Sequence, residues 1–252
     1  MIPQEMSLEG KTAIVSGDGT GWFRYLALAL GEAGADVAIA APHPQQIEAA
    51  AQEVRNMGRR AVAIATDMAS AAEAEAMAEK AVASLGKVDI LVNSANLFMA
   101  KPFLEIREEE LSRLMEANLV SLFRCCRAVG RHMVEQKKGR IINITSGLSQ
   151  RGLANCVAYC ASQGAVVQLT RALAIEWAAH GIRVNAIGAG WVTAGEASEE
   201  NMAREQLARY IPLRRWGHPS ELGGVLVWLA SDISDYATGQ VYFVDGGVLA
   251  HA

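Results

Sequence analysis

Short apolar runs recur along the chain and alternate with longer stretches in which apolar residues return every three or four positions. Short runs rich in β-branched side chains are typical of buried strands. We therefore predict seven strands, at Thr12–Ser16, Val37–Ala41, Ala61–Ala65, Val88–Val92, Arg140–Thr145, Arg183–Ile187 and Val241–Val244.

The stretches between these runs have the period of an α-helix, most clearly Gln45–Met57 and Ser70–Leu85. Glycines just before strands predict helix ends, at Gly58, Gly86, Gly139 and Gly181. Strict alternation of apolar strands with helices is typical of a parallel sheet covered on both faces. Right-handed crossovers then give an α/β fold, a doubly wound parallel sheet of about seven strands. No repeat or linker interrupts the pattern, so residues 1–252 are predicted to form a single domain.

Composition fits such a domain and excludes several classes of partner. Of the 252 residues, 51% are hydrophobic and 20% charged, and the formal net charge is −4. That balance argues against binding to nucleic acid or to anionic lipid. The first residues carry acids where a secretory signal has bases. The uncharged stretch 152–170 contains amides and suits a helix buried between protein surfaces better than a membrane span. We therefore expect a cytoplasmic protein.

The cysteine and histidine pattern gives no indication of a metal site. Cys125 and Cys126 are adjacent, Cys156 and Cys160 are one helical turn apart, and the five histidines are scattered. We therefore interpret the four cysteines as small buried hydrophobic side chains of a protein in a reducing compartment.

A glycine-rich turn, Ser16-Gly17-Asp18-Gly19-Thr20-Gly21-Trp22-Phe23, follows the first predicted strand. Glycines let the backbone approach a pyrophosphate, whose charge is stabilised at the N-terminus of the next helix. The position of this turn in the first β-α unit favours a dinucleotide site over a simple turn.

Several further motifs follow in order, among them Asn93-Ser94-Ala95-Asn96, the segment 139–146 and the segment 238–247. With the glycine turn, they make the chain resemble the short-chain dehydrogenase/reductase family from about Leu8 to Gly247. The resemblance implies a Rossmann-like single domain, NAD or NADP as cofactor, and a small carbonyl or secondary alcohol as substrate. It also implies cofactor-binding residues, at Ser16, Gly17, Thr20, Gly21, Trp22, Asp67, Met68, Asn93, Ala95, Tyr159, Gln163 and Val192.

The catalytic residues implied by the resemblance are Asn118, Ser146, Tyr159 and Gln163. Tyr159 would be the acid/base, Ser146 the hydrogen-bond donor to the carbonyl, Asn118 an organiser of water or backbone, and Gln163 a ribose contact. Ser146 lies thirteen residues before Tyr159, and Tyr159 and Gln163 share one helix face. Each residue alone also fits a structural role, such as a strand cap or a core tyrosine. Their joint spacing favours an inherited site.

Position 163 departs from the family pattern, because the family's Tyr-x-x-x-Lys ends here in glutamine. An unperturbed tyrosine has a pKa of about 10. A neighbouring ammonium group favours the phenolate and lowers that pKa, whereas a neutral amide supplies no such charge. We therefore expect the activity to be weakened.

Other departures concern the nucleotide. Phe23 stands where the family has a glycine and puts a large ring where the backbone normally approaches the cofactor closely, so we expect measurable but weakened cofactor binding. The second strand is followed by Pro42-His43 and lacks the acid that would accept the ribose hydroxyls of NAD, which gives a weak preference for NADP. The family's Pro-Gly after the sixth strand is Ala189-Gly190.

Three interpretations stay open. The leading one is an NAD(P)-dependent oxidoreductase, the second a catalytically silent or weak nucleotide-binding member of the family, and the third a cofactor-independent lyase that resembles halohydrin dehalogenases. The resemblance places the substrate loop at about 191–209. The pocket beside it is expected to be apolar, from Leu97, Phe98, Leu148, Leu153 and Trp191. It also implies a homotetramer, with the long helices Glu108–Gln136 and Cys156–Ala179 at one interface and the C-terminal segment at another.

Overall fold

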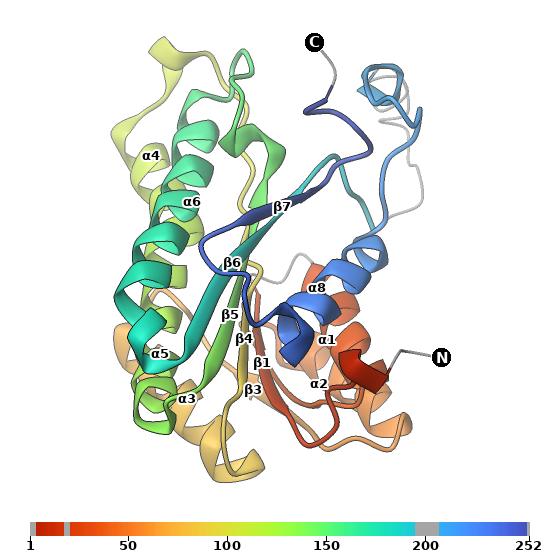
Figure 1. Ribbon diagram of the computed structural model, residues 1–252. Coiled ribbons are helices and arrows are strands. Elements are labelled where there is room, and N and C mark those ends of the chain that lie inside the picture. Colours follow the sequence, from red (N-terminus) through yellow and green to blue (C-terminus); the bar gives the residue numbers. More distant parts are fainter. Residues whose placement is uncertain (1–3, 18–20, 195–206, 251–252) are drawn as a thin grey trace.

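A sheet of seven parallel strands forms the centre of the computed structural model (Figure 1), which describes residues 4–17, 21–194 and 207–250. The strands lie in the order β3-β2-β1-β4-β5-β6-β7, and all neighbours are parallel. They are β1 Thr12–Ser16, β2 Asp36–Ala41, β3 Ala61–Ala65, β4 Ile90–Asn93, β5 Gly139–Ser146, β6 Ile182–Ala189 and β7 Val241–Val244. The predicted fold class is confirmed, and the predicted strands differ from these only at their ends.

Helices cover both faces of the sheet (Figure 1). One layer contains α1 Trp22–Glu32, α2 Pro44–Asn56 and α8 Gly223–Ala230. The other contains α3 Ala71–Leu85, α4 Glu108–Met115, α5 Ser121–Gln136 and α6 Val157–Trp177. Successive side chains of a strand point to opposite faces, so Val15 packs in the first layer and Ile14 in the second. Burial on both faces explains why the strands are continuously apolar.

Helix ends follow the predicted glycines at three of four places. Gly58, Gly86 and Gly181 adopt left-handed φ angles of 79°, 92° and 73°. The prediction for Gly139 is wrong, since this residue begins β5 and α5 ends at Lys137 in the left-handed conformation. A Cβ atom at Gly139 would collide with Met133, so a close approach of the helix accounts for the glycine.

The predicted long helix Glu108–Gln136 is divided by a π-helical turn, Glu116–Val120, which has Asn118 at its centre. Such turns widen a helix by one residue and often occur at functional sites. The tertiary contacts of Asn118, described below, account for its position.

The chain order places a crevice at the carboxyl edge of the sheet. From β1 the chain builds outwards to β2 and β3, and it then returns to add β4 on the other side of β1. Ligands of doubly wound sheets bind where the strand order reverses in this way. In the described ranges, every helix is too short or too polar to cross a membrane.

Candidate active site

Ser146 and Tyr159 meet at the carboxyl edge of β5. Ser146 is the last residue of this strand, and its hydroxyl accepts a hydrogen bond from the Leu148 amide at 3.1 Å. Tyr159 lies in the first turn of α6, almost completely buried, and the Ser146 hydroxyl is close enough to influence the pKa of its phenol. The structure therefore brings together the two residues expected to act on a carbonyl oxygen.

Gln163 lies one turn further along α6 and is only 1% exposed. Its side-chain oxygen accepts a hydrogen bond from Thr145 Oγ1 at 3.0 Å. This bond directs the Gln163 amide nitrogen towards Asn96, whose Oδ1 lies 3.5 Å away. The same Asn96 oxygen accepts the Tyr159 hydroxyl at 2.7 Å. Sequence reasoning missed Asn96 and Thr145 as members of the site, although Asn96 occupies the glycine of the family's N-N-A-G.

Burial is the main influence on Tyr159 and raises its pKa above the ordinary value. The neighbouring Ser146 and Asn96 side chains oppose this shift. In the described part of the chain, the groups acting on the phenol are the Ser146 hydroxyl, the Asn96 amide and two thiols, at Cys156 and Cys160. None of them carries a positive charge, so Tyr159 is held as a neutral proton donor.

Asn118 lies fully buried at the π-helical turn and acts on the backbone. Its Oδ1 accepts the Leu97 amide at 2.7 Å, and its Nδ2 donates to the Leu97 carbonyl at 2.9 Å and to Ser162 Oγ at 3.0 Å. Asn118 therefore fixes the segment after β4 against α6, and its contacts are those of a backbone organiser.

The side chains of Ser16 and Asn93 are committed to a buried network beneath the crevice. Ser16 Oγ donates to Asn93 Oδ1 at 2.9 Å, Asn93 Nδ2 to Asn143 Oδ1 at 2.9 Å, and Asn143 Nδ2 to Thr170 Oγ1 at 2.9 Å. These bonds link β1, β4, β5 and α6. At these two positions only the backbone can contact a ligand in the crevice.

The other residues expected at the nucleotide lie around the same edge. Asp67 follows β3 and accepts the Ala69 amide at 2.9 Å, while Met68 is buried and contacts the Cys125 sulfur. Ala95 is half-buried after β4, and Val192 follows β6 and pairs with Gly217. Thr20 lies outside the described residues.

The turn into α1 fits an anionic group of a dinucleotide. Gly21 has a φ of 86°, and no side chain caps the first turn of the helix, so its backbone N–H groups can face a phosphate. The ring of Phe23 is directed into the core and away from this turn. The side chain is 2% exposed and packs in the core with α2 and α8. A Cβ atom at Gly17 would lie 2.9 Å from that of Phe23, so Gly17 makes room for the ring.

A cleft of about 590 Å³ opens above Ser146, Tyr159 and Asn96. Its described walls are mainly apolar and aromatic and include Phe98, Leu148, Leu153 and Trp191, as predicted, together with Trp22 and Trp216. Leu97, predicted with them, packs instead against the buried cluster that contains Tyr159. Phe98 packs edge-on against Tyr159, with ring centroids 5.0 Å apart. Arg151 is the one cation among the described residues of this wall, and sequence reasoning missed it.

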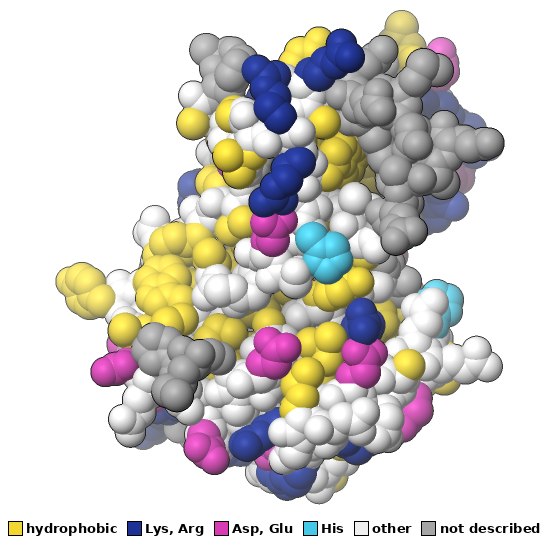
Figure 2. Space-filling view, turned by 90° about the vertical axis from the view of Figure 1, so that its right-hand side faces the viewer, with side chains coloured by type: hydrophobic (Ala, Val, Ile, Leu, Met, Phe, Trp, Pro, Cys, Tyr) yellow, Lys and Arg dark blue, Asp and Glu magenta, His cyan; other side chains and the backbone are white. Residues whose placement is uncertain are grey.

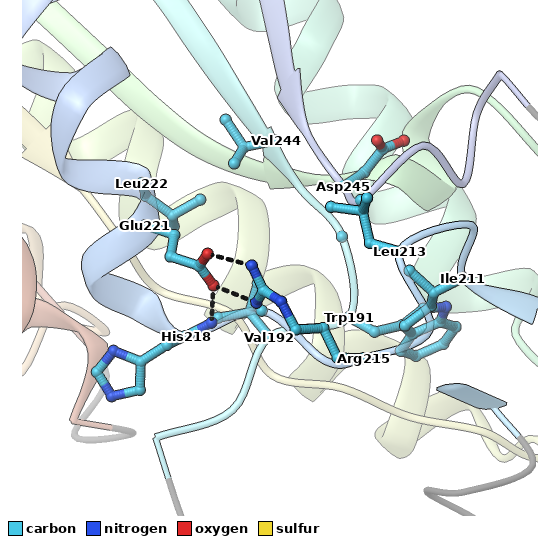
Figure 3. Close-up of a pocket in the computed structure, with 13 residues that line it drawn as sticks. Trp191, Val192, Ile211, Leu213, Arg215, His218, Glu221, Leu222, Val244 and Asp245 are labelled. Atoms are coloured by element: carbon cyan, nitrogen blue, oxygen red, sulfur yellow. Dashed lines mark hydrogen bonds and ion pairs between the residues drawn. The ribbon is translucent and has the colours of Figure 1, made fainter. Parts of the chain in front are cut away.

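A smaller pocket of about 90 Å³ lies beneath Trp191 (Figure 3). Figure 3 shows Arg215 paired with Glu221, whose carboxylate also accepts the His218 amide. This ion pair ties the turn at Arg215 to the helical turn before α8. It supports the segment after β6, so that Trp191 and Trp216 stand in contact at the mouth of the cleft, with ring centroids 5.8 Å apart.

Comparisons with known proteins agree with this geometry. A sequence model of a family described as enoyl-(acyl carrier protein) reductase matches residues 19–249. The chain is 39% identical over 256 residues to 2-dehydro-3-deoxy-D-gluconate 5-dehydrogenase of Dickeya dadantii, covering 99% of this chain and 100% of the relative.

Two solved structures are similar over nearly the whole chain. A gluconate 5-dehydrogenase of Burkholderia cenocepacia in complex with NADP and tartrate has a TM-score of 0.89 and 32% identity, with 98% of each chain covered. An NAD⁺-bound xylitol dehydrogenase has a TM-score of 0.89 and 29% identity, with 95% of this chain and 99% of the other covered.

Proposed function

Because the chain belongs to the short-chain dehydrogenase/reductase family, which interconverts carbonyls and alcohols, we propose that it is an NAD(P)-dependent oxidoreductase of a small sugar acid. The observation that carries the proposal is the Ser146–Tyr159 pair at the floor of the cleft. The Dickeya relative is named as a dehydrogenase of a sugar acid, and this supports the substrate class.

Tyr159 and Ser146 would act together on the substrate oxygen. A bound nicotinamide cofactor would exchange a hydride with the substrate carbon. In reduction, the Tyr159 hydroxyl gives its proton to the developing alkoxide while Ser146 donates a hydrogen bond to the same oxygen. The resulting phenolate then takes a proton from solvent. In oxidation, the phenolate removes the hydroxyl proton, so that direction requires deprotonated Tyr159.

The cofactor would lie along the carboxyl edge, between the turn at Gly17–Gly21 and the segment after β4. The absence of an acid directly after Ala41, where Pro42 and His43 follow, supports a weak preference for NADP. Similar proteins contain either NAD⁺ or NADP, so titration with both reduced cofactors decides the preference.

Arg151 supports the acidic substrate class. Its guanidinium donates to the Val248 carbonyl at 3.4 Å, and it faces the same cleft as Ser146 and Tyr159. The one described acid in that wall, Asp245, has its two oxygens bound to the Gly247 and Leu249 amides, each at 2.8 Å. A guanidinium group is well suited to hold a substrate carboxylate.

The proposal is tested by turnover of 5-keto and 5-hydroxy sugar acids with NADH, NADPH and the oxidised cofactors. Tyr159→Phe should abolish activity in both directions while cofactor binding stays detectable by fluorescence titration. Arg151→Gln should raise the KM for the acid at least about tenfold, and leave that for an uncharged polyol or ketose unchanged. Arg171→Gln, at an exposed arginine on α6 that does not line the cleft, is the matched control.

A catalytically silent nucleotide-binding protein is the second candidate, and the neutral Gln163 is the observation that favours it. Cofactor binding without turnover on any member of the panel would support it. The named dehydrogenases among the relatives give no support to a dehalogenase-like lyase. Absence of any dinucleotide binding would bring that alternative back.

A further inference from the structure

Asn96 joins the two residues of α6 that define the site. It lies on the segment leaving β4, and its Oδ1 receives two donors, the Tyr159 hydroxyl at 2.7 Å and the Gln163 amide at 3.5 Å. An amide oxygen can only accept hydrogen bonds. The shorter contact therefore exists only while Tyr159 carries its proton.

Hydrogen bonds to neighbouring residues hold both partners of the contact between Asn96 and α6 in place. On the α6 side, Thr145 holds the Gln163 oxygen at 3.0 Å and thereby turns the amide nitrogen towards Asn96. On the β4 side, the residue after Asn96 has its amide and carbonyl both bound by Asn118. The position of Asn96 is therefore set by the buried frame, as expected of a group that orients a reacting side chain.

From this geometry we propose that Asn96 is a positioning residue, which holds the Tyr159 hydroxyl as a proton donor and so biases the site towards carbonyl reduction near neutral pH. The inference rests on the proposed oxidoreductase function. Asn96 and Gln163 together form a neutral amide pair beside Tyr159, in place of a charged partner. Such a pair orients the phenol but supplies no positive charge to stabilise the phenolate.

Two substitutions separate positioning from charge. Asn96→Ala removes the acceptor, and we expect kcat for reduction to fall about tenfold with little change in KM, as for a lost hydrogen bond. Asn96→Asp keeps an acceptor oxygen and adds a negative charge beside the phenol. It should retain reduction, and the rising limb of the oxidation pH profile should move to higher pH by about one unit or more. Asn56→Ala, on the outer helix α2, is the matched control.

A direct titration makes the test independent of turnover. Phenolate absorbance of the cofactor-free protein, with Tyr159→Phe subtracted, reports the ionisation of Tyr159 alone. We expect Asn96→Asp to move that titration to higher pH. Unchanged titration in this variant would overturn the proposal, as would unchanged kcat for reduction in a folded Asn96→Ala. If every substrate fails while the titration shifts, the proposed function fails, but the contact of Asn96 with Tyr159 is confirmed.

Discussion

At the scale of single residues, the chemistry of the cleft depends on a buried phenol on which no cation of the described residues acts. Burial raises the pKa of Tyr159, and Gln163 contributes an amide that is itself held by Thr145 and directed at Asn96. Proton donation needs the neutral phenol, whereas alcohol oxidation needs the phenolate. The arrangement therefore suits reduction at neutral pH.

Restoring a charge at position 163 should reverse this bias. In Gln163→Lys an ammonium group one turn from Tyr159 would stabilise the phenolate and lower the pKa of Tyr159. Each unit by which the pKa falls should raise oxidation near pH 7 about tenfold and move the rising limb of its pH profile to lower pH. Initial rates of alcohol oxidation between pH 6 and 10 measure both effects.

Gln163→Met is the control for this experiment. It removes the amide without adding a charge, so the rising limb of the oxidation pH profile should not move. A lysine variant that binds cofactor and still shows no activity would contradict the role given to position 163. The silent-protein candidate would then be the better one.

The sequence predicts Ser146, Tyr159 and Gln163 as neighbours because spacing along a strand and a helix is local information. It does not predict the contact of Asn96 with Tyr159, which joins residues 63 positions apart. Nor does it place Arg151 in the cleft, because only the packing of the C-terminal segment against the loop after β5 creates that wall. Long-range contacts of this kind depend on tertiary packing.

At the scale of elements, strands and amphipathic helices follow from periodicity, whereas interruptions within them do not. The π-helical turn at Asn118 is stabilised by contacts with Leu97 and Ser162, which lie on other elements. The start of α1 gives a second example. A family pattern suggested that Phe23 faces the nucleotide, but the ring enters the core because Gly17 leaves space for it.

Phe23 should accordingly be a stability determinant. Phe23→Ala would leave a cavity between α1, α2 and α8 and should lower the free energy of unfolding by about 3–5 kcal/mol. Urea denaturation monitored by circular dichroism measures the loss. Phe98→Ala, at a half-exposed aromatic residue of the cleft, should lower the free energy of unfolding far less. Tighter cofactor binding in Phe23→Ala with unchanged stability would show that the ring does obstruct the nucleotide.

At the scale of the whole molecule, a cluster of charges at the amino edge of the sheet makes stability depend on pH. Arg140 on β5 is 5% exposed and pairs with Asp232 and Asp235, while Lys11 donates to Asp232 at 3.0 Å. Partial burial acts to raise the pKa of Asp232, but the hydrogen bonds from Lys11 and Arg140 and the charges of Lys11 and Lys138 outweigh it and lower the pKa to about 2 from an ordinary 3.8. The cluster links the start of β1 and β5 to the turn that follows α8.

Acid should therefore destabilise the fold over a defined range. The folded-state pKa lies below the unfolded one, so the contribution of Asp232 is complete above about pH 4 and is lost as the pH falls towards 2. Asp232→Asn should be less stable than wild type at pH 7, and the difference should shrink as the pH falls through this range. Thermal unfolding of both proteins at pH 7, 4 and 3 measures this difference in stability. A constant difference would show that Asp232 makes no pH-dependent contribution.

The last property of the whole molecule is its assembly, for which we predict a homotetramer. The outer layer of α4, α5 and α6 (Figure 1) and the turn before it carry exposed hydrophobic side chains, among them Leu104 at 96%, Ile175 at 82% and Phe123 at 47%. On the face shown in Figure 2, hydrophobic side chains also gather between charged ones. Exposed apolar groups on adjacent helices are typical of a surface covered by another subunit.

Light scattering at micromolar concentration should give a particle of four times the chain mass of 26.9 kDa. Phe123→Asp would place a charge within the predicted helical interface and should leave smaller particles, because an unpaired charge cannot be buried there without a large cost. Met57→Ser, at a half-exposed position after α2 on the opposite layer, should leave the mass unchanged. A wild-type particle of one chain mass would contradict the prediction. The exposed side chains of α5 and α6 would then belong to the free surface of a monomer.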